Sequence, residues 1–352
     1  MNPIFDRIGT VSREQGFRME GWWVWGSSVV KGEDGRYHMF ASRVPKYQRF
    51  HPAWMIASEI VRASSDTPEG PYAFEEVVLP ARGAQYWDGR STHNPRMVKH
   101  GDTYVLYYMG STHPFEDVTE EMADQLTLDS KWCIAGRANK RIGIAVANSV
   151  FGPWERMDAP VLETKPDSFY SFLTSNPAPV IHDDGSAHLI FKSRRYEGHI
   201  HSEMNIGLAT APHYAGPYTV LNDEPLFSEK TFGVIEDPFL WKNEDGFHML
   251  AKDQFGEITG ERGAGILAHS PDCLGWTLHD DPKAYTRNIQ WADGSRQLLG
   301  NVERCSALVE DGQPSHLFFA IWEGEGGFSD PKPGNHSWNM VVPLKPVSAG
   351  SV

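Results

Sequence analysis

VIEDPFLWKNEDGFHMLAK, residues 234–252, is the stretch of sequence that decides the fold. It begins with two adjacent carboxylates and a proline, continues as an apolar run, and turns at Asp245-Gly246 into a second apolar run. An Asp-Gly pair between two such runs is a strong signal for a β-hairpin. We therefore predict a hairpin with charged residues at its open end, where Glu236 and Lys252 lie.

The same hairpin pattern occurs five times along the chain. Its turn glycines are Gly35, Gly101, Gly185, Gly246 and Gly312. Between hairpins lies a second pattern, an apolar strand followed by a Gly-Pro-aromatic turn, as at Gly70-Pro71-Tyr72. Each repeat therefore holds about four strands, and a four-stranded unit repeated radially is a propeller blade. We predict an all-β fold, a five-bladed β-propeller with four-stranded antiparallel blades around a central axis.

No linker-like stretch separates the repeats, so we expect a single domain over residues 1–352. The repeats lie around residues 22–80, 88–162, 170–228, 234–286 and 301–345. The fifth repeat could be completed either by residues 338–344 or by the N-terminal segment. One helix is expected around residues 118–126, as an insertion in the longest gap between repeats.

Composition and charge exclude several functional classes. The formal net charge is -14 and no basic run is present, which argues against a nucleic-acid partner. No run of 18 apolar residues is present and the N-terminus lacks a signal-peptide pattern, so we expect no membrane partner and a cytoplasmic location, or a secreted or periplasmic one if a signal has been removed. The three cysteines show no metal-ligand spacing. The oligomeric state stays open.

Charged, polar and aromatic residues gather where the innermost strands would begin or the next strands would end. These candidates are Trp25, Arg43, Asp88, His93, Asn94, Asn176, Lys192, Glu236, Asp237, Lys252, Glu303 and Arg304. In a propeller these positions meet at one end of the axis, and such a mixture lining a pocket is typical of a carbohydrate site. Each residue also has a structural explanation, because Asn or Asp before proline can cap a strand and tryptophans can close a core.

These motifs also carry a family resemblance. The sequences EDPFLW (236–241) and STHNP (91–95), the pair Glu303-Arg304 and the Gly-Pro-aromatic turns resemble the five-bladed propeller glycoside hydrolases of the arabinanase, levansucrase and invertase superfamily, near families 43 and 117. The resemblance covers nearly the whole chain. It implies an exo-acting glycoside hydrolase that cleaves a terminal bond of a plant or algal oligosaccharide and requires no cofactor. It allows a structural calcium ion on the axis, and a histidine, here His93, as the acid.

One departure from the family lies in the first blade. Family 43 has an Asp-Pro on the innermost strand there, carrying the general base, whereas this chain has Gly26-Ser27-Ser28. The family's catalytic residues therefore do not transfer directly to this sequence.

Glycosidic cleavage needs one carboxylic acid that protonates the leaving oxygen and one carboxylate that acts at the anomeric carbon. Neighbouring residues of a strand point to opposite sides, so we expect Glu236 or Asp237, but not both, to work with Asp88 or Glu303 from another blade. The resemblance implies inversion. The remaining candidates would bind substrate: Trp25, Arg43, His93, Asn94, Asn176, Lys192, Lys252 and Arg304.

Two alternatives stay open. The first is an enzyme on the same fold that acts on fructosides or transfers glycosyl groups. The second is a non-catalytic carbohydrate-binding propeller, because a propeller by itself specifies no activity.

Overall fold

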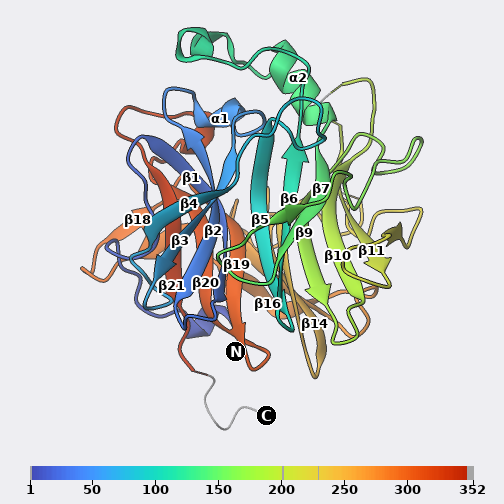
Figure 1. Cartoon of the computed structure of the whole chain (residues 1–352). Helices are drawn as coiled ribbons and strands as arrows, with labels where there is room; N and C mark the ends of the chain where they lie inside the picture. The colour runs from blue at the N-terminus through green and yellow to red at the C-terminus, as the bar shows by residue number, and fades with distance from the viewer. Residues whose placement is uncertain (1, 200–201, 229, 347–352) are drawn as a thin grey trace.

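Hairpins at the five predicted positions open five antiparallel sheets that surround one axis (Figure 1). The computed structural model describes residues 2–199, 202–228 and 230–346. The first strands of neighbouring sheets contact each other, which places them nearest the axis. The predicted all-β, five-bladed propeller is confirmed.

Four of the sheets have four strands, paired in chain order. The first sheet contains β1 (Trp22–Lys31), β2 (Tyr37–Pro45), β3 (Glu59–Ser65) and β4 (Ala73–Leu79). The second contains β5 (Ser91–His100), β6 (Thr103–Ser111), β7 (Arg141–Ala147) and β8 (Glu155–Arg156). The third contains β9 (Leu173–Ile181), β10 (Ala187–Arg194), β11 (Met204–Ala211) and β12 (Thr219–Val220). The fourth contains β13 (Ile235–Asn243), β14 (Gly246–Asp253), β15 (Gly265–Ser270) and β16 (Thr277–Tyr285).

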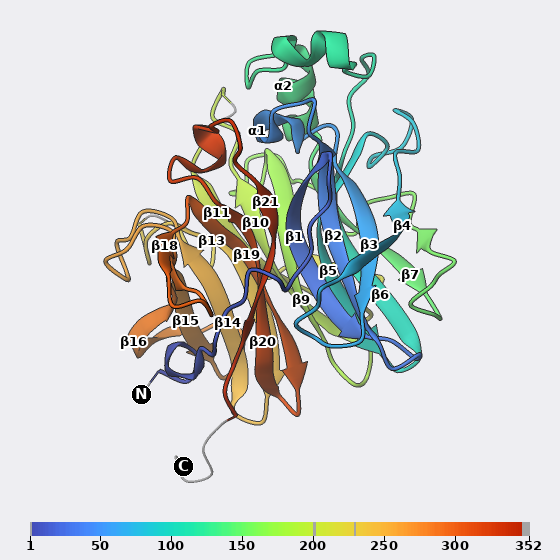
Figure 2. The same ribbon diagram turned by 90° about the vertical axis from the view of Figure 1, so that its left-hand side faces the viewer.

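The fifth sheet is closed by both of the segments that the sequence left as alternatives. It consists of β19 (Asn301–Glu310), β20 (Gln313–Trp322) and β21 (Ser337–Pro343). The N-terminal segment then pairs with the outer side of β21, where Phe17 and Asn339 exchange two backbone hydrogen bonds of 3.0 Å (Figure 2). A small hairpin, β17 (Asn288–Gln290) and β18 (Arg296–Leu298), precedes this sheet. The chain end thus closes the ring of blades, which protects an otherwise open strand edge.

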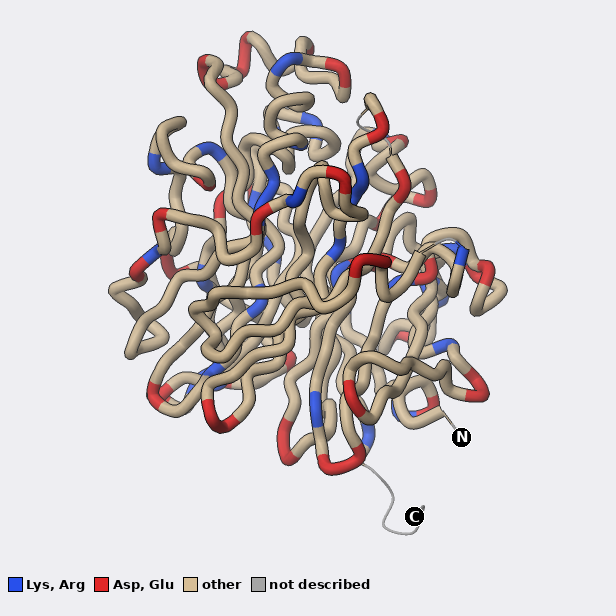
Figure 3. Tube along the Cα trace, turned by 90° about the vertical axis from the view of Figure 1, so that its right-hand side faces the viewer, with Lys and Arg blue, Asp and Glu red and all other residues tan. Residues whose placement is uncertain are grey.

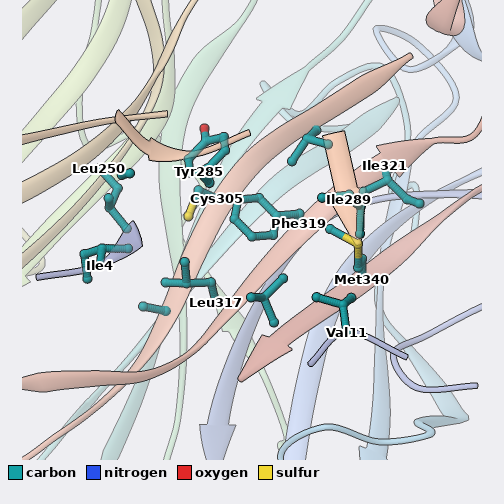
Figure 4. Packing of buried hydrophobic residues seen from close by; sticks show 14 of the residues in the cluster. Ile4, Val11, Leu250, Tyr285, Ile289, Cys305, Leu317, Phe319, Ile321 and Met340 are labelled. Atoms are coloured by element: carbon teal, nitrogen blue, oxygen red, sulfur yellow. The ribbon is translucent and has the colours of Figure 1, made fainter. Parts of the chain in front are cut away.

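Apolar side chains fill the space between neighbouring sheets. Between the fourth and fifth sheets, Tyr285, Phe319 and Met340 pack together, and Ile4 and Val11 of the N-terminal segment join them (Figure 4). Full burial of a side chain such as Phe319 stabilises the fold by about 1.5–3 kcal/mol. The N-terminal segment is therefore held by core packing as well as by strand pairing.

Short helices lie at one end of the propeller (Figure 1). They include α1 (Phe50–Ala53), η2 (Glu120–Gln125), α2 (Lys131–Ala138) and η3 (Gly327–Ser329), while η1 (Phe5–Arg7) belongs to the N-terminal segment. The helix expected around residues 118–126 is only the 3-10 helix η2, and the longer α2 follows it. Trp132 and Cys133 of α2 pack with Phe50 of α1. No helix in the described part of the chain is long and apolar enough to cross a membrane.

Every innermost strand carries a β-bulge at the same place. At each bulge one residue has a positive φ: Gly26 (24°), Asn94 (55°), Asn176 (51°), Asp237 (57°) and Arg304 (56°). A bulge inserts an extra residue and re-aims the side chains around it. Asn and Asp tolerate this left-handed backbone better than most residues, which explains their presence at three of the five bulges.

Arg96 fills the axis beyond the bulges. Its guanidinium donates to the carbonyl oxygens of Ser27 (3.3 Å), Pro238 (3.3 Å) and Cys305 (2.7 Å), which belong to three other blades. Burial and the charge of Arg304 lower the pKa of Arg96 to about 9. Arg96 therefore joins four blades at the centre of the fold.

We predict that Gly26→Ala destabilises the protein by about 1–3 kcal/mol. A Cβ at this position would lie 3.0 Å from Asn94 Oδ1 and 3.4 Å from Arg304 Cγ, on a backbone with positive φ. Urea denaturation would measure the change in the free energy of unfolding. Gly275→Ala is the matched control, because its φ is not in the left-handed region and its nearest neighbour is 3.9 Å away. Equal stability of the two variants would contradict this account of the bulge.

Candidate active site

A pocket of about 220 Å³ opens at the helical end of the axis. Strands near the axis form its floor, and Phe50 of α1, Arg137 of α2 and Phe328 of η3 stand around its mouth. The structure brings together ten of the twelve residues predicted from the sequence: Trp25, His93, Asn94, Asn176, Lys192, Glu236, Asp237, Lys252, Glu303 and Arg304. Residues from all five blades therefore meet in one cavity.

Asp88 does not reach this pocket, which corrects its assignment as a catalytic residue. Its carboxylate is fully buried beside the second blade, 2.6 Å from Arg82 Nε, and accepts a 2.7 Å hydrogen bond from the hydroxyl of Tyr108. Arg156 approaches within 3.5 Å. Asp88 therefore balances two arginines inside the protein and cannot touch a substrate.

Arg43 is also outside the pocket, for a reason of strand register. Lys192 lies opposite Ser175 and Lys252 lies opposite Glu236, whereas Arg43 lies opposite Val24, one residue away from the equivalent position. A shift of one residue turns a side chain to the other face of a sheet. The guanidinium of Arg43 accordingly pairs with Glu59 and stacks on Trp22, 3.9 Å from the ring centre.

Four side chains at the bulges form a hydrogen-bonded floor. Asn94 Nδ2 donates to Asn176 Oδ1 (3.0 Å), and Asn176 Nδ2 donates to Asp237 Oδ1 (2.8 Å). Arg304 completes the chain with its Nη1 2.9 Å from Asp237 Oδ1 and its backbone N–H 3.1 Å from Oδ2. The Gly26 position faces Asn94 and Arg304, and a Cβ there would lie 3.0 Å from Asn94 Oδ1. An aspartate at this position would crowd the floor.

The residue that precedes the positive-φ residue of each bulge lines the pocket. In two blades this preceding residue is a carboxylate, Glu236 or Glu303. Glu236 forms ion pairs with both Lys192 and Lys252, the latter at 2.9 Å. The same Lys252 Nζ lies 3.0 Å from Glu303 Oε1, and Asn301 donates a 2.8 Å hydrogen bond to that oxygen. One ammonium group thus bridges two carboxylates from adjacent blades.

The two bridged carboxylates have opposite pKa shifts. Burial raises the pKa of Glu303, and the carboxylates of Asp237 and Glu236 raise it further against the opposing effect of Lys252. Burial also acts to raise the pKa of Glu236, but Lys192 and Lys252 outweigh it and bring that pKa well below its usual range. The pKa of Glu303 is thus raised while that of Glu236 is lowered, and two carboxyl groups whose pKa values diverge are suited to acid and base roles.

Aromatic rings form the other side of the pocket. Trp25 packs on Phe50 with ring centres 4.6 Å apart, and Trp54 stacks on His93 at 5.3 Å. His93 Nδ1 lies 2.7 Å from the hydroxyl oxygen of Ser58. Burial, followed by the charges of Arg304 and Lys140, lowers the pKa of His93 well below its usual value. A neutral His93 can bind a hydroxyl group, but it is poorly suited to the acid role that the family resemblance allows.

Sequence reasoning missed the cations that the insertion supplies. Arg137 on α2 and Lys140 before β7 both line the pocket, and so does Arg194 on β10. The run RANKR at residues 137–141 was the available signal, because it is strongly basic within an acidic chain. It lies in the insertion between two hairpins, where the repeat pattern gives no register.

The described residues offer little support for the structural calcium that the family allows. They contain no group of three or more His, Cys, Asp or Glu residues that could hold a metal ion. Carbonyl oxygens on the axis would be suitable calcium ligands. Three such carbonyls, those of Ser27, Pro238 and Cys305, already accept hydrogen bonds from Arg96. An axial calcium ion therefore remains a prediction. The carbonyl oxygens on the axis do not fit it, because they already bind the guanidinium of Arg96.

We predict that Asp237→Asn unfolds more easily than the wild type, by about 3 kcal/mol. Asp237 and Arg304 are 3% and 2% exposed, and removal of the carboxylate charge leaves the guanidinium buried without its partner. Chemical denaturation measures the difference. Asp245→Asn, at an exposed position in the turn of the same hairpin, is the control. If Asp237→Asn were as stable as this control, the floor would not depend on the ion pair.

Comparison with known proteins identifies the fold. No protein-family profile and no curated protein sequence matches the chain. Among solved structures, a family 117 glycoside hydrolase from the marine bacterium Zobellia galactanivorans has a TM-score of 0.65 at 15% identity, covering 96% of this chain and 89% of that one. A thermostable family-43 glycoside hydrolase gives 0.60 at 14% identity, with 96% of each chain covered. An α-L-arabinanase mutant from Cellvibrio cellulosa gives 0.55 at 15%, with 93% of each covered. In its fold, the chain is thus similar to the five-bladed propeller glycoside hydrolases, as its motifs indicated.

Proposed function

We propose that the protein is a glycoside hydrolase in which Glu303 donates the proton and Glu236 is the ionised carboxylate. The observation that carries this proposal is the pair of carboxyl groups with opposite pKa shifts, held in one pocket by Lys252. Glycosidases need such a pair on either side of the bond that breaks. The propeller glycoside hydrolases with the same fold add support.

The pocket suggests how a sugar would be held. Trp25 and Trp54 line the pocket with aromatic surface of the kind that contacts sugars, while charged groups line the other side. Glu303 would protonate the glycosidic oxygen, and Glu236 would act at the anomeric carbon. A cavity of about 220 Å³ suits one sugar unit rather than a length of polysaccharide, which favours action at a chain end.

The spacing of the two carboxylates bears on the stereochemistry. Glu236 Oε2 lies 2.9 Å and Glu303 Oε1 lies 3.0 Å from Lys252 Nζ. The distance between these two oxygens therefore cannot exceed the sum of the two distances. Retaining glycosidases hold their carboxyl groups about 5–5.5 Å apart, and inverting ones about 6.5–9.5 Å. Because the nearest oxygens of the two carboxylates are held this close, we propose retention, with Glu236 as the nucleophile, in place of the inversion that the family resemblance implies.

We predict that Glu303→Gln lowers kcat about 100-fold or more on substrates with a poor leaving group, because the amide cannot donate the proton. The assay is hydrolysis of aryl arabinosides, xylosides and galactosides, with sucrose included to detect fructoside activity. A dinitrophenyl glycoside should be affected far less, since its leaving group needs little protonation. Glu310→Gln, at an exposed position on the same strand, is the control.

The pH profile tests the same assignment. Wild-type kcat/KM should fall as the pH rises through the raised pKa of Glu303, since only the protonated form is active, and the variant should lack this alkaline limb. On the acidic side, activity should persist to low pH because the pKa of Glu236 is lowered. An unchanged rate and profile in Glu303→Gln would remove Glu303 from the mechanism.

We predict that the product first released keeps the anomeric configuration of the substrate. Proton NMR of the fresh reaction mixture distinguishes the two anomers before they interconvert. Release of the opposite anomer would support inversion, and the water-activating base would then have to lie farther from Glu303 than Glu236 does.

One observation favours a non-catalytic carbohydrate-binding protein as the alternative. Gly26 stands where the resemblance implies the first-blade carboxylate, and a side chain there would crowd Asn94 and Arg304. Such a protein would bind a glycan without producing new reducing ends. Binding with no turnover across the aryl glycosides and sucrose would therefore favour this alternative.

A further inference from the structure

The pocket carries an excess of positive charge, although the chain as a whole is acidic. Its cationic residues are Arg137, Lys140, Lys192, Arg194, Lys252 and Arg304, against the carboxylates Glu236, Asp237 and Glu303. The formal net charge of the chain is -14. Figure 3 shows acidic segments at turns on the end of the propeller opposite α2. The positive charge is therefore a local property of this cavity.

Only part of that charge is balanced inside the pocket. Lys192, Lys252 and Arg304 pair with the three carboxylates. Neither Lys140 nor Arg194 forms an ion pair with any carboxylate of the described residues. The two unpaired cations stand on the same wall of the pocket, at the start of β7 and the end of β10.

Lys140 is the more deeply buried of the two unpaired cations. It is only 3% exposed, and its ammonium lies 3.8 Å from the centre of the Trp54 ring. Within residues 2–199, 202–228 and 230–346, that ammonium has no hydrogen-bond acceptor. Burial, and then the charges of Arg137, Lys192 and Arg194, lower its pKa well below the usual value. Burying an unpaired charge among like charges is destabilising, and a bound anion would remove that cost.

Arg194 offers free donors to the same anion. Its Nη1 donates to the carbonyl oxygen of Ser202, while its remaining N–H groups have no acceptor among the described residues. Guanidinium and ammonium groups side by side bind carboxylate and sulfate oxygens through short, charge-assisted hydrogen bonds. Because Lys192 contacts Glu236 and also lies near Lys140, the cationic wall adjoins the two carboxylates of the proposed reaction.

We propose that the pocket binds a sugar unit carrying an anionic substituent, a carboxylate or a sulfate ester, which contacts Lys140 and Arg194. This inference rests on the proposed function for the position of the sugar, whose glycosidic bond would face Glu236 and Glu303. Aromatic side chains, Trp25 and Trp54 among them, line the pocket beside these cations, so the ligand is an acidic saccharide rather than a simple anion.

Calorimetric titration of the wild type tests the preference directly. The probes are glucuronate and galacturonate for the carboxylate, galactose 6-sulfate for the sulfate ester, and glucose and galactose as neutral references. At least one acidic sugar should bind about tenfold tighter than its neutral reference, and the difference should shrink at high salt. Tighter binding of the uronates would identify a carboxylate as the substituent, and tighter binding of galactose 6-sulfate would identify a sulfate ester. Equal affinity for every acidic and neutral probe overturns the proposal.

Variants then assign the preference to the two residues. Lys140→Met and Arg194→Met should each lower affinity for the preferred acidic sugar about tenfold and lower affinity for the neutral sugar much less, so that the preference is lost. Lys165→Met and Arg195→Met are charge-matched controls at exposed positions outside the pocket, and they should bind like the wild type. A preference retained in both pocket variants overturns the proposal. If one variant fails to fold, the other decides.

Stability separates a binding role from a structural one. If Lys140 serves a ligand, Lys140→Met should unfold at the same or a higher temperature than the wild type, because it removes an unpaired buried charge. A marked loss of stability together with a parallel loss of neutral-sugar binding would show a structural role and overturn the proposal.

The two proposals fail in different ways. Hydrolysis of neutral glycosides with no preference for acidic ones would overturn the anionic specificity and leave the hydrolase proposal standing. Tight binding of an acidic sugar without hydrolysis would support the anionic specificity and reject the hydrolase.

Discussion

The ion pair between Asp237 and Arg304 is the interaction on which the pocket depends. Both groups are buried near the axis, and Asp237 also accepts a hydrogen bond from Asn176, which in turn accepts one from Asn94. These four side chains come from four different blades. Their bonds therefore fix the blades relative to one another, and with them the position of Glu303, one residue before Arg304. A change in this floor would alter the geometry of the site even where no substrate contact is lost.

Neighbouring residues at each bulge have different structural roles. At each bulge the residue with positive φ belongs to the floor, and the residue before it lines the pocket. The floor is chemically constrained, since its side chains must complete a continuous chain of hydrogen bonds from Asn94 to Arg304. The preceding position is free to differ from blade to blade, as the changes from Trp25 to His93 to Glu236 illustrate. This separation explains how the chain can lack the first-blade carboxylate at Gly26 and still hold two carboxyl groups above the floor.

The sequence was sufficient for the fold because the hairpin turns and strand patterns are local and repeat five times. It was also sufficient for most of the pocket, since strand starts near a propeller axis must converge. The failures have tertiary causes. The position of Asp88 is set by its contacts with Arg82 and Tyr108, which the strand pattern does not predict. Arg43 lies one residue away from the strand position that faces the pocket. Lys140 lies in an insertion outside the repeat, so no periodic signal could place it.

The net charge of the chain and the local charge of the pocket determine different properties of this protein. The acidic total governs long-range properties such as solubility and the exclusion of nucleic acid, and it is carried largely by exposed turns. The potential inside the pocket is governed by a few buried groups that water screens poorly. Lys140 remains among other cations because α2 is anchored by Trp132 and Cys133, so core packing offsets the repulsion. A fold that holds like charges together at a cost in stability has that arrangement for a reason other than stability, and a ligand of opposite charge is the simplest physical reason.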